Sequence, residues 1–317
     1  MEIPKISVLI ICYKQEELIK RAINSLLAQK DYIYEICVSD DCSSDRTWDV
    51  LLEYDKLYPG LFKLHQNYPN IGIFENIEHT WTMPTGDIIY RLAGDDECGE
   101  GWFKSVIEYI QKNNIDYKNE LFCIYGDYLA IYPNGDKFIR SNRLAGKYQL
   151  NSLSLSIRTA IGPRSACYSI NILKKFVKVS QGRSYIAEDA IDKQMPLNTE
   201  KSYYIPKVGN IYYASIGVCV NMSSKELNGR VDIFKYSYTF LKSKNALSKK
   251  DEYYMLFKDA LLRYKNHKSL KSLAKILKLL ILGFVPKYDL HFAVLQRLLF
   301  AIRRRIPHRK PLVIKIG

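Results

Sequence analysis

The chain alternates apolar segments of strand length with segments of helical periodicity between residues 6 and 112. The first apolar segment, Ile6–Cys12, is continuous and rich in β-branched residues, which is typical of a strand buried on both faces. The next segment, residues 16–29, instead repeats its apolar residues at helical spacing. This alternation predicts a mostly parallel, doubly wound α/β sheet with helices on both faces.

The same patterns give the expected elements one by one. We expect strands over residues 6–12, 34–41, 61–66 and 87–94, and helices over 16–29, 44–57, 73–83 and 101–112. The second helix should have Ser44 as its N-cap and should bury Trp48, Leu51 and Leu52. A hairpin with its turn at Pro133–Asp136 should follow, and later two closing strands around Gly209–Asn210.

The positive charge is confined to the last quarter of the chain. Residues 241–317 contain 19 Lys and Arg against 4 Asp and Glu, a net charge of +15, whereas the remainder has 28 basic and 29 acidic residues, a net charge of −1. We therefore expect a catalytic domain over 1–225, divided into a nucleotide-binding half (1–125) and an acceptor-side half (126–225). A helical, basic C-terminal extension should cover 226–317.

Cysteine usage and hydropathy bear on the compartment. The seven cysteines are scattered and form no Cys-x-x-Cys pair, which argues against a disulfide framework and for a reducing, cytoplasmic environment. The apolar run near the N-terminus is too short for the core of a signal peptide. No stretch of about 18 apolar residues occurs, so we expect no transmembrane helix.

Two pairs of adjacent acids follow two of the expected strands. Asp40 and Asp41 end the second strand, and Asp95 and Asp96 follow the fourth. Either pair alone could be an ordinary solvated turn. In an open parallel sheet, however, ligands bind beyond the carboxyl ends of the strands, where both pairs should share one edge. Two such pairs therefore indicate a site.

Five motifs in a fixed order carry a resemblance to a known family. They are "ISVLIICYK", "EICVSDDCSSDRT", "NIGIFEN", "TGDIIYRLAGDD" and "AEDAI". Over about residues 4–220 the chain resembles the inverting nucleotide-sugar glycosyltransferases of family 2, which have the GT-A fold. The resemblance implies a nucleotide-sugar donor, with UDP favoured as the nucleotide, and a saccharide acceptor.

The resemblance also assigns residues on the donor side. Asp95 would bind Mn²⁺ or Mg²⁺, and Asp40 would accept a hydrogen bond from an N–H of the base. Tyr13 would pack against the base or hydrogen-bond to it. Asp41 would orient backbone or ribose groups, or only cap a turn. Asn70, Gly72 and Asn76 would shape the loop near the nucleotide, or be purely structural. The full donor-binding set implied is Cys12, Tyr13, Asp40, Asp41, Asn70, Gly72, Asn76, Arg91, Ala93 and Gly94.

The acceptor hydroxyl needs a general base, and a positioned carboxylate suits this role. The resemblance points to Asp189, with Glu188 as its neighbour or substitute, although acids near a helix start also stabilise the helix dipole. Transfer should invert the anomeric centre. The chain lacks the Gln-x-x-Arg-Trp motif of processive synthases, which implies the addition of one sugar.

The sequence departs from the family pattern at several positions. Ala93 replaces the first Asp of the Asp-x-Asp motif, Cys42 a common Gly, and Lys14 a common Asn. The segment "YYASIG" lacks the Arg and His often found there. Arg164 or Arg183 could supply that charge, or could be ordinary surface residues.

The basic C-terminal region contains two candidate amphipathic helices. Lys268, Lys271, Lys275 and Lys278 form one stripe, and Arg303–Arg305 end the second helix. This pattern favours an anionic membrane surface on the inner face of the cell membrane, which suits a lipid-linked acceptor in bacterial polysaccharide or glycan assembly. The alternative is a helical subdomain that packs on the catalytic domain or mediates a homo-oligomer. No nucleic-acid-binding motif accompanies the charge.

Two other functions remain open from sequence. A nucleotidyltransferase also uses a doubly wound sheet and a metal-binding acid, but it should carry a glycine-rich basic loop after the first strand, which "CYKQEE" is not. A non-catalytic partner that binds a nucleotide sugar or a membrane would tolerate Ala93.

Overall fold

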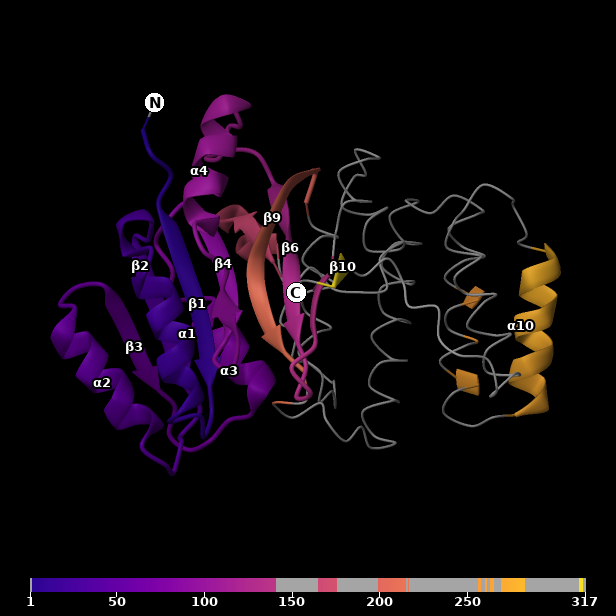
Figure 1. Ribbon diagram of the computed structural model, residues 1–317, viewed down its shortest axis with the longest axis horizontal. Coiled ribbons are helices and arrows are strands. Elements are labelled where there is room, and N and C mark those ends of the chain that lie inside the picture. Colours follow the sequence, from indigo (N-terminus) through magenta and orange to yellow (C-terminus); the bar gives the residue numbers. More distant parts are fainter. Residues whose placement is uncertain are drawn as a thin grey trace.

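A computed structural model shows a mixed α/β sheet flanked by helices (Figure 1). It describes residues 2–140, 165–175, 199–214, 216, 256–257, 260, 263–264, 269–282 and 314–315. The four expected N-terminal strands are β1 (Ile6–Cys12), β2 (Glu35–Asp40), β3 (Phe62–Gln66) and β4 (Ile88–Ala93). The intervening helices are α1 (Leu18–Leu27), α2 (Thr47–Leu57), α3 (Ile73–Thr80) and α4 (Trp102–Lys112), and a short 3-10 turn, η1 (Lys30–Tyr32), precedes β2.

The second half of the described chain is less regular. The short strand β5 (Glu97–Cys98) precedes α4, and the predicted hairpin is formed by β6 (Phe122–Ile131) and β7 (Lys137–Arg140). It is followed by β8 (Ala166–Ser169), η2 (Ile170–Lys175), β9 (Lys201–Tyr213), α10 (Leu270–Leu282) and β10 (Ile314–Lys315).

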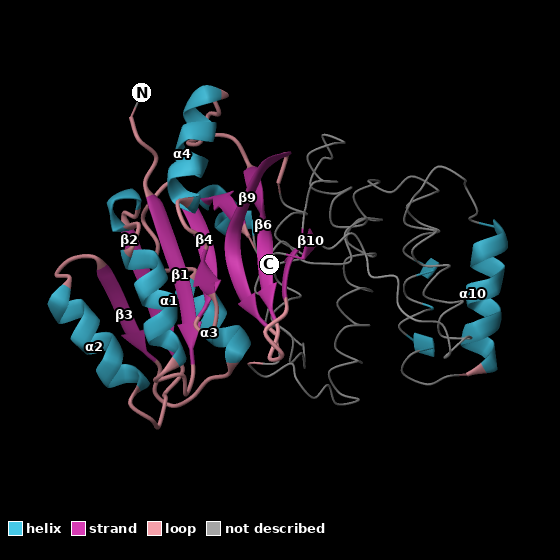
Figure 2. Ribbon diagram, viewed as in Figure 1, coloured by secondary structure: helices cyan, strands magenta, loops and turns pink. Residues whose placement is uncertain are grey.

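The sheet is parallel in its first half and mixed in its second. Its strand order is β10-β7-β6-β8-β4-β1-β2-β3, with β9 paired to β5 and β6. β1 lies between β2 and β4 and runs parallel to both, while β8 is antiparallel to β4 and β6. Figure 2 shows β1, β4, β6 and β9 pointing to the same edge. The expected doubly wound arrangement therefore holds for the segment from β1 to β4.

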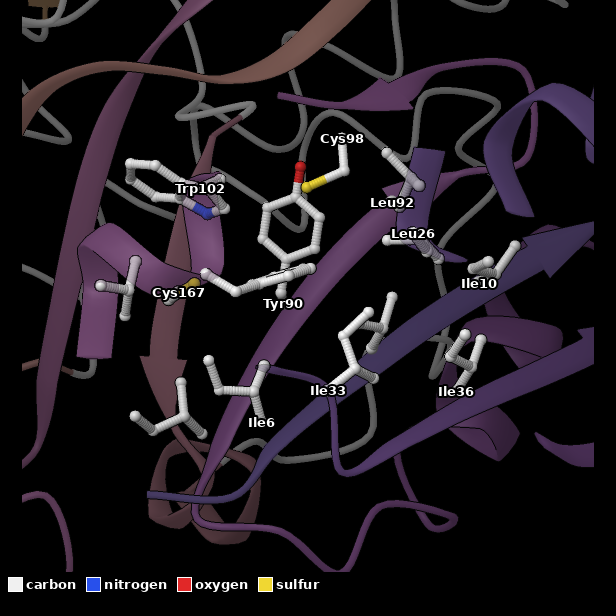
Figure 3. Packing of buried hydrophobic residues seen from close by; sticks show 14 of the residues in the cluster. Ile6, Ile10, Leu26, Ile33, Ile36, Tyr90, Leu92, Cys98, Trp102 and Cys167 are labelled. Atoms are coloured by element: carbon white, nitrogen blue, oxygen red, sulfur yellow. The ribbon is translucent and has the colours of Figure 1, made fainter. Parts of the chain in front are cut away.

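Each face of the sheet has its own apolar core. Alternate residues of β1 divide between the two: Ile6, Val8 and Ile10 pack with α1, α2 and α4, whereas Leu9 packs with α3. A strand buried on both faces needs apolar residues at nearly every position. Figure 3 shows the first core, where Tyr90 extends toward Cys98 beside Trp102.

Three predictions about these elements are wrong. The predicted strand pair around Gly209–Asn210 is one strand, β9. Gly209 is needed for close packing and not for a turn, since a Cβ there would lie 2.7 Å from Trp102 Cδ2. The N-cap of α2 is Arg46 instead of Ser44, and Leu52 points outward while Val50 is buried.

The C-terminal region is described only in part. In α10, Ile276 is buried against Phe257 and Ala260, whereas Leu270 and Leu277 are exposed. None of the helices described is both long and apolar enough to span a bilayer. The predicted second basic helix, after Pro286, lies outside the described residues.

Candidate active site

The carboxyl ends of β1, β2 and β4 bring both acid pairs to one edge of the sheet (Figure 1). Cys12, at the end of β1, pairs with Asp40 at the end of β2. On the other side of β1, Ile11 pairs with Ala93, the last residue of β4. Because neighbouring strands of a sheet lie about 4.8 Å apart, the acids after β2 and β4 are separated by only the width of β1.

Asp40 is fully buried, and protein donors fill its carboxylate. Oδ1 accepts from the hydroxyl of Ser43 and from the thiol of Cys12 at 3.7 Å. Oδ2 accepts from the backbone N of Ser43 and from Nε2 of Gln66, each at 3.0 Å. A carboxylate offers about four acceptor positions. A base N–H can therefore reach Asp40 only where one of these donors gives way; Gln66 and Ser43 are partly exposed, whereas Cys12 is buried.

Cys12 acts in this network as a thiol. Burial, and then the neighbouring Asp40 carboxylate, raise the pKa of Cys12 well above its usual value. The side chain therefore stays protonated and donates to Asp40. Tyr13, the next residue, is 45% exposed, with the Lys14 ammonium 5.1 Å from its ring centre. The exposed ring of Tyr13 therefore lies directly after the carboxyl end of β1.

Asp41 organises the loop before α3. Its Oδ1 accepts from Ile71 N at 2.9 Å and from Asn67 Nδ2 at 3.1 Å, and its Oδ2 accepts from Gly72 N at 2.9 Å. Its carbonyl accepts from Asn70 Nδ2 at 2.6 Å. A carboxylate at these amides also complements the positive end of the α3 dipole. Asp41 thus orients backbone groups of this loop, and the same bonds equally fit the alternative of an acid that only caps a turn.

The other loop residues of the predicted set serve the same arrangement. Asn76 is buried on α3, where its Oδ1 accepts from Asn67 Nδ2 at 2.8 Å and its Nδ2 donates to Ser39 O at 3.2 Å. Gly72 adopts a φ of 90°, which glycine tolerates without strain. Arg91 lies within β4 opposite Leu9.

Two departures from the family pattern fall at left-handed backbone positions. Lys14 has a φ of 53° and Cys42 a φ of 59°. Glycine and asparagine favour this conformation, and other residues pay for it. Lys14 N donates to Ser43 Oγ at 2.8 Å, which joins the loops after β1 and β2. The left-handed backbone at these two positions therefore explains why Asn and Gly are common there in the family pattern.

The acids after β4 form a tight loop, residues 94–97, called here the acid loop. Gly94 is buried, and a Cβ there would lie 3.2 Å from Ile11 O and would overlap Gln15 Oε1. Asp96 is 4% exposed, its N donates to Ala93 O at 3.1 Å, and its Oδ1 accepts from Tyr213 N at 3.3 Å. Asp96 is thus a structural acid, whereas Asp95 is partly exposed.

The acid loop fits a divalent cation that phosphate and water also coordinate. Carboxylate oxygens are the ligands that Mg²⁺ prefers, and Mg²⁺ usually takes only one or two of them beside substrate phosphates. Within the part of the chain that the structure describes, no group of three His, Cys, Asp or Glu side chains could hold a metal by itself. Asp95, which is partly exposed, could supply one carboxylate to such a cation.

The remaining predicted residues cannot be placed. Asp189, Glu188, Arg164 and Arg183 all lie outside the described residues. The sequence did not predict four residues whose side chains contact the two acid pairs or Glu97: Gln66, Asn67, Arg21 and Tyr213. The contact of Asp40 with Ser43 was also not predicted, but the local sequence could have indicated it. The two residues are three apart in "DDCS", and Asp side chains commonly bond nearby backbone N–H groups.

Comparison with known proteins matches the same region. The model of the family described as "Glycosyl transferase family 2" matches residues 7–167. An uncharacterized protein of Mycobacterium tuberculosis is 28% identical over 163 residues, 51% of this chain and 46% of that protein. The GalNAc(5)-diNAcBac-PP-undecaprenol beta-1,3-glucosyltransferase of Campylobacter jejuni is 27% identical over 212 residues, 66% of this chain and 64% of that protein. The chain thus spans about half the length of its mycobacterial relative.

Solved structures agree on the fold. TarS of S. aureus, residues 1–349 in complex with UDP-GlcNAc, superposes with a TM-score of 0.62 at 17% identity, covering 87% of this chain and 79% of that TarS chain. The mannosyltransferase PcManGT from Pyrobaculum calidifontis, in complex with GDP-Man and Mn²⁺, gives a TM-score of 0.54 at 12% identity over 96% and 89% of the two chains. The chain has the fold of these glycosyltransferases, which confirms the predicted GT-A architecture.

Proposed function

The chain belongs to glycosyl transferase family 2, and from that membership we propose that it moves one sugar from a nucleotide sugar to a saccharide acceptor with inversion. The observation that carries the proposal is the common edge at which the carboxyl ends of β2 and β4 place Asp40, Asp41 and Asp95. One strand separates the acids that face the nucleoside from the acid that faces its diphosphate. This spacing suits a ligand with a base at one end and phosphates at the other.

We assign the nucleoside to the β2 side of this edge. Tyr13 offers an exposed ring to the base, the Asp40–Gln66 pair offers polar groups to its edge, and Asp41 holds the loop before α3. UDP is the favoured nucleotide, and TarS, similar in fold, binds UDP-GlcNAc. GDP remains a testable alternative, since PcManGT is described with GDP-Man.

We assign the diphosphate to the acid loop, with Asp95 as the protein ligand of Mn²⁺ or Mg²⁺. When bound, such a cation neutralises negative charge on the departing diphosphate. The described residues supply the rest of the arrangement: Asp96 is fixed to Tyr213, and the buried Gly94 keeps the loop close to β1. Ala93 leaves Asp95 as the single motif carboxylate for the cation.

Transfer then requires one bond to form and one to break. The acceptor oxygen bonds to the anomeric carbon while the bond from that carbon to the diphosphate oxygen breaks, and the acceptor proton passes to a carboxylate. We propose Asp189 as this base, with Glu188 as the substitute. Attack opposite the leaving group inverts the anomeric centre.

The acceptor is proposed to be a lipid-linked saccharide, as the name of the C. jejuni relative indicates for that protein. Helix α10 exposes Leu270 and Leu277 next to Lys271 and Lys278. Exposed leucines beside lysines suit an anionic bilayer surface, where each nearby Lys adds about 1 kcal/mol to binding. We propose residues 1–225 as the catalytic domain and 226–317 as a peripheral anchor on the inner membrane face.

The test is a donor screen with the full chain. Purified protein is incubated with UDP-, GDP- and other nucleotide sugars, with Mn²⁺ or with a chelator, and release of nucleoside diphosphate is measured. We expect metal-dependent release from one class of donor, abolished in Asp95→Ala and retained in the surface control Asp49→Ala. No release from any donor, with acceptor glycolipids supplied, would favour a non-catalytic binding protein.

Two further variants test the assigned roles. Asp189→Asn should abolish transfer while donor binding persists, and full transfer by this variant would show that another group is the base. Binding to anionic liposomes should fall when Lys271 and Lys278 are both changed to Glu. Unchanged liposome binding would reject α10 as the anchor.

A further inference from the structure

The side chain of Arg21, on α1, contacts both the acid loop and Tyr213 of β9, three segments that are far apart in sequence. On α1, its Nη2 donates to the carbonyl of Asp95, and its Nε lies 3.4 Å from Glu97 Oε1. Its guanidinium carbon stacks 3.5 Å from the ring centre of Tyr213, at the end of β9. One side chain thus contacts the main chain at Asp95, a carboxylate of the same loop and an aromatic ring.

Tyr213 completes the arrangement from the other side. Its hydroxyl donates to Glu97 Oε1, and its backbone N donates to Asp96 Oδ1 at 3.3 Å. Burial, and then the bond to Glu97, raise the pKa of Tyr213 to about 12. The hydroxyl therefore stays protonated and remains a donor to Glu97 at any working pH.

This cluster explains how three consecutive acids are tolerated. Asp95, Asp96 and Glu97 place three carboxyl groups on adjacent residues, and Arg21 brings a guanidinium against Glu97 and the main chain at Asp95. The Arg21 side chain is 28% exposed and that of Glu97 22% exposed, so the pair is partly shielded from solvent.

We propose that Arg21 is a positioning residue that fixes the main chain at Asp95, and hence the point from which Asp95 reaches the cation. The inference rests on the proposed function, in which the acid loop holds the donor diphosphate through a metal. Glu97 and Tyr213 in turn hold the guanidinium plane. A lysine cannot replace Arg21, because its single ammonium cannot donate to a carbonyl, pair with Glu97 and stack on the ring together.

The test compares metal binding with metal-free nucleotide binding. Arg21→Lys and Tyr213→Phe are matched with Arg46→Lys, an exposed arginine of surface ion pairs, and Tyr54→Phe, whose hydroxyl bonds Asn24 on the protein surface. Mn²⁺ binding is titrated at saturating UDP, and UDP binding is titrated separately in chelator. Melting temperatures are recorded for all variants.

We expect Mn²⁺ affinity to fall about tenfold in Arg21→Lys and several-fold in Tyr213→Phe, which corresponds to the loss of one charge-assisted hydrogen bond. Metal-free UDP affinity should change less than about twofold, because no proposed base contact is lost. Both controls should match wild type. Tyr213→Phe keeps the stacked ring, so it tests the inference even where Arg21→Lys does not fold.

Two results would overturn the inference. Wild-type Mn²⁺ affinity in both variants would show that Arg21 does not position Asp95. A loss of metal-free UDP affinity as large as the loss of Mn²⁺ affinity would show that Arg21 has a general structural role instead. A wild-type protein that binds no Mn²⁺ in the presence of UDP would reject the proposed function as well, which separates the two failures.

Discussion

Replacing Asp41 by Asn tests the link between the acid after β2 and the loop before α3. Asp41 Oδ1 accepts from Ile71 N and Asn67 Nδ2, and Oδ2 accepts from Gly72 N. Asparagine keeps the size of the side chain but has one acceptor oxygen. In its best orientation it keeps the two bonds to Oδ1 and turns an NH₂ group toward the N–H of Gly72.

The expected cost follows from these three contacts. Losing the bond to Gly72 removes a charge-assisted hydrogen bond, which contributes about 1.5 to 3 kcal/mol. The two retained bonds lose their charge and become weaker. Gly72 is partly exposed, so water compensates part of the unsatisfied N–H. We expect the free energy of unfolding to fall by about 2 to 3 kcal/mol.

Urea unfolding measures the global change, and hydrogen exchange measures the local one. The amides of Ile71 and Gly72 should lose protection in Asp41→Asn, while amides in β1 should lose only as much as the global change requires. Asp116→Asn is the control, because its carboxylate bonds Asn119 on the surface. A change below about 0.5 kcal/mol, or unaltered protection at Gly72, would refute the role of Asp41 in holding this loop.

Three further predictions concern strain, charge and packing. Cys42→Gly should raise the free energy of unfolding by about 0.5 to 1 kcal/mol in urea, because a φ of 59° costs cysteine more than chain entropy costs glycine; a lower midpoint would contradict this. Burial alone would raise the pKa of Glu35, but bonds from Lys63, Ser7 and Thr85 outweigh it and lower the pKa. Its contribution to stability is therefore present above the unfolded pKa of about 4.3 and is lost as the pH falls through the lower folded value. The penalty of Glu35→Gln in urea unfolding should accordingly be larger at pH 7 than at pH 3, and equal penalties would refute the assignment. Gly209→Ala should lower the free energy of unfolding by about 1 to 3 kcal/mol, because the new Cβ would lie 2.7 Å from Trp102 Cδ2; an unchanged melting temperature would contradict it.

Strands and helices were predictable where one face or both must be apolar. The continuous run Ile6–Cys12 is β1, buried on both sides, and the helical spacing of Trp102, Phe103, Val106, Ile107 and Ile110 matches the buried side of α4. The first residue of α2 was not predictable, because Ser44 is a good N-cap when only the local sequence is considered. The helix instead begins at Thr47, whose N donates to Asp45 Oδ1 at 3.1 Å.

The candidate site was predictable in position but not in contacts. Strand order alone places Asp40 and Asp95 on one edge, because parallel strands end together. The donors that fill Asp40, such as Gln66, and the contact of Arg21 with Tyr213 depend on tertiary packing between segments far apart in sequence. Local patterns carry no information about such pairs.

The proposed function depends most directly on UDP and a divalent cation binding together through Asp95. Isothermal titration of UDP, with Mn²⁺ and with chelator, measures this coupling in wild type and in Asp95→Asn. We predict that Mn²⁺ tightens UDP binding at least about tenfold in wild type and less than about twofold in Asp95→Asn. UDP binding that ignores Mn²⁺ in wild type, or a full Mn²⁺ effect in Asp95→Asn, would contradict the account.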